Sequence, residues 1–247
     1  MIRKKHRVRP MLGLAIAGMC AALLAGIAPA DAAALRILPV RIEVAPDKQF
    51  CALSIANDDS NPTTVQIRGF GWTKDVDGRD QLDPDTGPSI NPAIVSIPGG
   101  ETRLIRCSLP VKKLGTREES YRLVIDELPT AAVAPGTVRP LLRISIPVFR
   151  TPPKAVAAVG WALVTGADGK SRLSLANQGA RHAQILAVRL RAVAPGDGPV
   201  KLTQAFYLLA GGRIELPIEP SGGGGIAGVE LETVDGMLRA FPVGGER

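Results

Sequence analysis

The sequence predicts an all-β protein made of two β-sandwich domains behind an N-terminal export signal. Apolar residues with the 3.6-residue period of a helix are absent after residue 32. Short runs of alternating apolar and polar residues recur instead, separated by clusters of Gly, Pro, Asn and Asp, which is typical of sandwiches and barrels. The dipeptide Pro152–Pro153, which cannot continue a strand ladder, separates two series of such runs.

The first 32 residues are expected to be a secretory signal peptide rather than part of the fold. Five basic residues within Arg3–Arg9 precede the uncharged apolar run Met11–Ile27, and small residues follow in Ala28–Ala32. Cleavage is expected after Ala32, with Ala30 as the alternative. An uncleaved membrane anchor is disfavoured because the apolar run is short for a span. We therefore expect an exported protein that is not inserted in a membrane after cleavage.

The charge of the mature chain argues against nucleic-acid binding. The full sequence of 247 residues has 30 Lys and Arg and 23 Asp and Glu. Loss of residues 1–32 leaves 25 basic and 22 acidic residues, a balance of +3. This excess is too small to predict an electrostatic footprint for nucleic acid.

Two cysteines, Cys51 and Cys107, remain in the mature chain, and both lie in strand-like runs. In an exported protein they most simply form one disulfide, with two buried free thiols as the alternative. In the chain-entropy model, closing this loop would stabilise the fold by roughly 4 kcal/mol. A metal site is not expected, because His182 is the only histidine left to join them.

Residues 33–150 are expected to form the first domain, with about seven strands, as in an immunoglobulin-like sandwich. A long polar loop, Asp75–Pro92, interrupts the series. The expected strands are Leu35–Val44, Phe50–Asn57, Thr63–Trp72, Pro92–Ile97, Glu101–Leu109, Ser120–Leu128 and Arg139–Phe149.

Residues 151–247 are expected to form a second, smaller β-sandwich, in which Asp-Gly turns at 168–169 and 235–236 each join two strands. The glycine-rich segment Ser221–Gly225 is interpreted as a linker, since no Lys-Ser/Thr or helix follows it as in a phosphate-binding loop. The expected strands are Val159–Val164, Ser171–Ala176, Gln184–Ala192, Ala205–Leu209, Arg213–Pro217, Val229–Val234 and Leu238–Val243.

Residues for catalysis are few, and no enzyme is expected. A nucleophile–histidine arrangement would have to use His182, which is interpreted as a surface residue near the start of a strand. The acid pairs Asp58–Asp59 and Glu118–Glu119 are interpreted as solvated loop residues. A glycosidase-type pair would also want aromatic residues around a sugar, and the chain is only 4% aromatic.

Six motifs follow one another in a characteristic order. They are P-V-R-I-E-V (Pro39–Val44), C-A-L-S-I-A-N (Cys51–Asn57), S-I-N-P-A-I-V-S-I-P-G-G (Ser89–Gly100), E-T-R-L-I-R (Glu101–Arg106), E-S-Y-R-L-V-I-D-E-L-P (Glu119–Pro129) and I-P-V-F-R (Ile146–Arg150). In this order they resemble the periplasmic pilus-assembly chaperones of the chaperone–usher pathway, and most closely the branch that serves spore-coat-protein-U-type pili. The resemblance covers most of the mature chain and is specific mainly in the first domain.

This resemblance implies two immunoglobulin-like domains in a boomerang arrangement and a non-enzymatic function in the periplasm. The partners would be pilin subunits, which lack their last strand, and an outer-membrane usher; no cofactor is implied. The chaperone would supply a strand that completes the pilin, by β-strand addition. A structural pilus subunit or adhesin with the same fold is the alternative. It is disfavoured because only Ala33 and Ala34 precede the first expected strand, too few for a donor extension.

The resemblance implies that Arg139–Phe149 is the donated strand. Alternation places Leu142, Ile144, Ile146 and Val148 on one face, which we expect to insert into the client. The pattern alone equally allows this set to pack only into the chaperone's own core. Residues Val133–Thr137 are expected to extend the donor when a client orders them.

The resemblance also implies that a cationic pair anchors the client's C-terminal carboxylate. Arg41 matches the first-strand arginine of this pair. The position of the expected donor-strand lysine falls on Ile146, so Arg143 or Arg150 replaces it, or the comparison is offset by one residue. Arg150 and Glu118 also match charged residues that the family uses to fix the angle between its domains.

Overall fold

The computed structural model describes residues 35–129, 140–166, 168–193, 200–218 and 225–243. The expected signal peptide, the extension Val133–Thr137 and most of the glycine-rich segment lie outside these ranges. Residues Ala33–Arg247 form one compact unit, and the described part of it contains two separate hydrophobic cores. No helix among the described residues has the length and apolar composition needed to cross a membrane.

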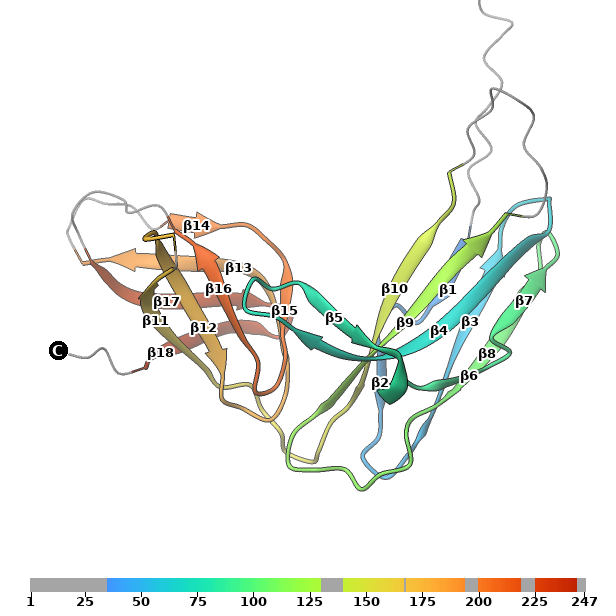
Figure 1. The fold of residues 1–247 in the computed structure, drawn as a ribbon, viewed down its shortest axis with the longest axis horizontal. Coiled ribbons are helices and arrows are strands. Elements are labelled where there is room, and N and C mark those ends of the chain that lie inside the picture. The colour runs from blue at the N-terminus through green and yellow to red at the C-terminus, as the bar shows by residue number, and fades with distance from the viewer. Residues whose placement is uncertain (1–34, 130–139, 167, 194–199, 219–224, 244–247) are drawn as a thin grey trace, which may run out of the picture. The chain divides into compact units, whose positions relative to one another are not determined.

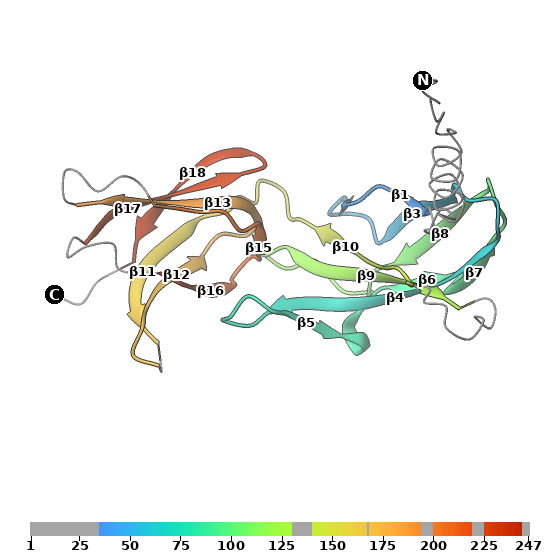
Figure 2. The same cartoon turned by 90° about the horizontal axis from the view of Figure 1, so that it is seen from above.

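The first sandwich has two layers, visible in Figure 2, and its core lies between them. One sheet has the order β1-β3-β8-β6, and the other has the order β2-β10-β9-β4-β5, with β7 also paired to β4. The strands are β1 (Leu35–Leu38), β2 (Ile42–Val44), β3 (Phe50–Asn57), β4 (Thr63–Lys74), β5 (Asp80–Asp83), β6 (Ser89–Asn91), β7 (Ile94–Ile97), β8 (Thr102–Ser108), β9 (Glu119–Leu128) and β10 (Arg143–Arg150), with a 3₁₀ turn η1 (Pro84–Thr86).

The expected single strand Leu35–Val44 is two strands in different sheets. β1 runs antiparallel to β3, whereas β2 runs parallel to the end of β10. The chain crosses from one sheet to the other at residues 39–41. Ile37 on β1 and Ile42 on β2 therefore reach the first core from different layers. A pattern of alternating apolar residues does not reveal such a switch, because each half keeps its own alternation.

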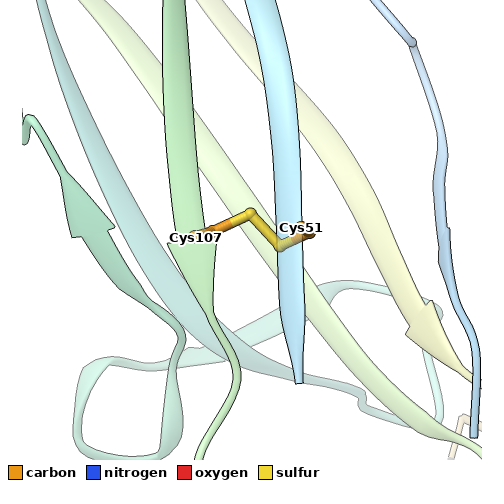
Figure 3. The surroundings of a disulfide bond; sticks show 2 residues. All are labelled: Cys51 and Cys107. Atoms are coloured by element: carbon orange, nitrogen blue, oxygen red, sulfur yellow. A yellow bond between two sulfur atoms is a disulfide. The ribbon is translucent and has the colours of Figure 1, made fainter. Parts of the chain in front are cut away.

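The disulfide predicted between Cys51 and Cys107 is confirmed. The two residues lie directly opposite each other on β3 and β8, and their Cα atoms are 4.9 Å apart (Figure 3). This separation is within the usual range for a disulfide. Both cysteines are part of the first core.

The second sandwich encloses the second core and follows the strand order β14-β13-β17-β18-β11-β12-β16, with β15 paired to β13 (Figure 1). β18 joins its two halves, because it pairs with β17 on one side and with β11 on the other. The strands are β11 (Val159–Thr165), β12 (Ser171–Asn177), β13 (Ala183–Ala192), β14 (Val200–Leu202), β15 (Phe206–Leu208), β16 (Arg213–Pro217), β17 (Ile226–Thr233) and β18 (Gly236–Pro242). The predicted class, all-β with two sandwiches, is confirmed.

Candidate functional site

Among the residues that the structure describes, the strand β10 has a border that is open along most of its length. On one side it pairs with β9 from Arg143 to Arg150. On the other side β2 pairs only with Val148–Arg150. Within the described residues, Arg143–Pro147 therefore has no partner strand on that side, and Figure 1 shows the start of β10 extending past β2. An open border of this kind is a template for another strand.

The structure divides the four residues that were expected to insert into a client. Leu142 is 38% exposed, and Ile144 is half-buried at the margin of the first core. Ile146 is only 2% exposed and Val148 is fully buried, and both belong to the first core. The assignment of Ile146 and Val148 as client-binding residues stays a prediction, and their burial does not add support to it. They lie where β2 and the facing sheet complete the protein's own sandwich, so their surface is already covered.

The main chain of β10 alternates between its two neighbours. The carbonyl of Leu142 accepts a hydrogen bond of 2.9 Å from the N–H of Glu127, so the main chain of Leu142 faces the β9 side. Because successive strand residues point their main-chain groups to opposite sides, Arg143 and Ser145 direct theirs to the open border. The main chain of Pro147 faces the open border as well, but proline has no N–H, so the border lacks a hydrogen-bond donor at this residue.

Arg41, predicted to anchor a carboxylate, lies immediately before β2, beside the open part of β10. Its side chain is half-buried, its Nε lies 3.3 Å from Glu43 Oε1, and its Nη1 donates to Gln184 Oε1 at 3.3 Å. Both contacts are long, so the guanidinium has donors to spare for a better acceptor.

The two arginines considered for the second half of the anchor are both committed elsewhere. Arg150 is 2% exposed, and its Nη2 lies 2.9 Å from Glu119 Oε2 and 3.0 Å from the carbonyl oxygen of Lys112. These contacts favour the structural role expected for Arg150, and its role as a carboxylate anchor stays a prediction. The side chain of Arg143 is 70% exposed but makes a close ion pair with Asp126.

A third arginine, Arg122, lies directly opposite Pro147 on β9 and was missed from the sequence. Its guanidinium carbon lies 3.7 Å from the ring centroid of Trp72, and its Nη2 lies 3.4 Å from Asp80 Oδ2. Burial lowers the pKa of Arg122 despite the nearby carboxylate. The only signal in the sequence was a charged residue inside an otherwise apolar run. The contacts with Trp72 and Asp80 make Arg122 part of the packing, because the aromatic ring covers its guanidinium and the carboxylate pairs with it.

His182 was expected on the surface, but it is buried and paired with Glu118. Glu118 Oε1 lies 2.7 Å from His182 Nδ1 and accepts a 3.0 Å hydrogen bond from the His182 N–H. Glu118 Oε2 accepts a 2.7 Å hydrogen bond from the hydroxyl of Thr151. The His182 ring also stacks on Phe149, with centroids 3.7 Å apart. Neither residue is a solvated loop residue, because side chains distant in the sequence cover both.

The described residues contain no group of three or more His, Cys, Asp or Glu that could hold a metal ion. A cavity of about 600 Å³ is lined by residues that include Trp72, Lys112, Glu119 and Tyr121. The Glu119 carboxylate in it already contacts Arg150, Lys112 and the Tyr121 hydroxyl. We assign no cofactor to this cavity.

Comparison with known proteins agrees with this geometry. Residues 34–156 match the family described as pili and flagellar-assembly chaperone, PapD N-terminal domain. No curated protein sequence matches the chain.

Solved structures with the same fold include several chaperones. A chain from the CsuC–CsuE chaperone–tip adhesion subunit complex of Acinetobacter baumannii is 21% identical with a TM-score of 0.69, covering 86% of this chain and 100% of that one. A chain from the complex of Salmonella enterica SafA pilin with the SafB chaperone is 16% identical with a TM-score of 0.58, covering 84% and 96%. The E. coli chaperone DraB is 15% identical with a TM-score of 0.58, covering 86% and 98%.

The motifs of the first sandwich, its open strand border and the family match agree with one another. The chain belongs, through residues 34–156, to the family of pili and flagellar-assembly chaperones.

Proposed function

We propose that the mature protein is a periplasmic chaperone that binds pilin subunits by adding the start of β10 to their incomplete sheets. The observation that most supports this is the open border of Arg143–Pro147, with Leu142 and Ile144 accessible beside it. The related folds from complexes described as chaperone–tip adhesion subunit and as pilin with chaperone are consistent with this function. Assignment to the spore-coat-protein-U branch stays a prediction.

Strand addition at this border would use main-chain and side-chain groups for different purposes. Arg143 and Ser145 offer N–H and C=O groups for hydrogen bonds to a client strand, which give affinity without regard to sequence. Leu142 and Ile144 project from the face that continues the first core, so they would fill apolar pockets of the client. The client in turn would cover an edge that otherwise invites aggregation.

Arg41 would bind the client's terminal carboxylate. A guanidinium can hold a carboxylate through two parallel hydrogen bonds, and such bonds strengthen where water is excluded. The bound chaperone would then deliver the client to an outer-membrane usher, with release driven by exchange for a better-fitting strand of the next subunit.

The test is co-purification from the periplasm of the mature protein with a pilin expressed from the same cell. Ile144→Asp places a charge in the proposed apolar contact and is expected to lower recovery of the pilin at least about tenfold. Arg41→Ala removes the proposed charge-assisted hydrogen bonds and is expected to have an effect of similar size. Val111→Asp adds the same charge at an exposed loop position and should leave recovery unchanged. Full recovery with both Ile144→Asp and Arg41→Ala would refute the assignment.

A further inference from the structure

Two adjacent acids, Asp126 and Glu127, lie at the end of β9 opposite the start of β10. Because they are neighbours in a strand, their side chains project to opposite faces of the sheet. Glu127 is only 4% exposed, and the Asp126 side chain is also largely covered. Each contacts a different residue at the start of β10, next to the open border.

Glu127 contacts the main chain of Leu142 twice, once through its carboxylate and once through its own N–H. The N–H of Leu142 donates to Glu127 Oε2 at 3.2 Å. The carbonyl of Leu142 accepts from the N–H of Glu127 at 2.9 Å. A main-chain N–H forms a stronger hydrogen bond with a carboxylate than with a neutral acceptor, and the Glu127 side chain that accepts here is buried.

Asp126 holds the side chain of Arg143 on the other face. Its carboxylate lies between Arg143 on β10 and Arg68 on β4, with Arg68 Nη2 at 2.7 Å from Asp126 Oδ2. Burial alone would raise the pKa of Asp126, but the hydrogen bonds from Arg143 and Arg68 lower it. Asp126 therefore stays ionised and links the first residue of β10 to two neighbouring strands.

These contacts matter because, in the described part of the chain, the start of β10 pairs with a strand on one side only. Such an end can fray, and a slip of one residue would turn Ile144 to the opposite face of the sheet. Resting on the proposed function, we propose that Asp126 and Glu127 are positioning residues that fix the register of β10 and keep Leu142 and Ile144 ordered before a client arrives. A pre-ordered strand lowers the entropic cost of binding.

Amide hydrogen exchange of the purified mature protein tests the positioning directly. The alternation set by Leu142 directs the N–H of Ile144 toward β9, so its exchange rate reports opening of this end. Glu127→Ala is expected to accelerate exchange at Ile144 about 10- to 100-fold. Glu127→Gln keeps a carbonyl acceptor and should restore most of the protection, and Asp126→Ala should give a smaller acceleration than Glu127→Ala.

The amide of Leu231, in the inner strand β17 of the second sandwich, is the internal control. Unchanged exchange at Ile144 in Glu127→Ala would overturn the inference. An equal acceleration at Leu231 would also overturn it, because the effect would then be global. Equal exchange in Glu127→Gln and Glu127→Ala would overturn the role of the acceptor.

Binding kinetics connect the positioning to the client. With a purified pilin, Glu127→Ala is expected to slow association about tenfold, with a smaller effect on dissociation, because the strand must order during binding. Association at the wild-type rate would overturn the proposed role in binding. If the wild-type protein binds no pilin, the proposed function fails, while the exchange experiment still decides whether these acids order β10.

Discussion

Replacement of Arg150 by Ala is expected to destabilise the first sandwich by about 3 kcal/mol. The guanidinium is buried, and its Nη2 lies 2.9 Å from Glu119 Oε2. It also donates to the carbonyl oxygens of Lys112 at 3.0 Å and Lys48 at 3.5 Å. Breaking a buried ion pair typically costs about 3–5 kcal/mol, because the remaining charge is left uncompensated. We expect the lower end, since Lys112 and the Tyr121 hydroxyl still contact Glu119 in the variant.

Urea unfolding followed by circular dichroism measures this loss as a change in the free energy of unfolding. Arg79→Ala is the matched control, because its ion pairs with Asp75 and Asp77 are exposed and should contribute less than about 1 kcal/mol. The double variant Arg150→Ala with Glu119→Gln should recover part of the loss, because it also removes the negative charge that Arg150 neutralised. A loss below about 1 kcal/mol for Arg150→Ala would refute a structural role for this residue.

Three further predictions concern packing, the disulfide and the tyrosines. Gly69→Ala should destabilise the fold by about 1–3 kcal/mol, because a Cβ there would overlap the carbonyl oxygen of Pro88, whereas Gly115→Ala, with open space around it, should be nearly neutral in the same unfolding assay. Reduction of the bond between Cys51 and Cys107 should lower the free energy of unfolding by up to about 4 kcal/mol, measured by thermal unfolding with and without reductant. Burial raises the pKa of both tyrosines of the chain, so ultraviolet titration near pH 10 should detect less tyrosinate in the folded protein than in the unfolded protein. The folded pKa values of the tyrosines lie above the unfolded ones, so the neutral tyrosines contribute to the stability of the fold. This contribution is fully present below about pH 10 and is lost as the pH rises through the folded pKa values.

The alternation of apolar residues predicted most strands of both sandwiches, because each strand buries one face. It missed β5 and β6, which lie inside the polar segment Asp75–Pro92. All four residues of β5 are exposed, so this strand has no buried face and therefore no apolar period. It is held by its pairing with the end of β4 across the turn at residues 75–79.

The candidate site was predictable as a segment but not residue by residue. The sequence places Leu142, Ile144, Ile146 and Val148 on one face. A strand shows this alternation both when the face packs into its own core and when it binds a client. Which of the two covers each residue depends on how far β2 extends along β10, and no local pattern encodes that length. The burial of His182 likewise depends on Phe149 and Glu118, which are distant in the sequence.

The two parts of β10 differ in what covers them, so one alternating strand can belong to the first sandwich and still offer a segment to the sheet of a proposed client. At Val148–Arg150 the strand is paired on both sides, and Ile146 and Val148 belong to the first core. Within the described residues the border before Pro147 is open, and Leu142 and Ile144 lie at the margin of that core or beyond it. A client strand could therefore pair with the segment that ends at Ser145 but would find no donor at Pro147, so the proline sets the limit of the shared sheet. On this argument Pro147→Ala would lengthen the border available to a client without altering Ile144, the residue that we propose enters it.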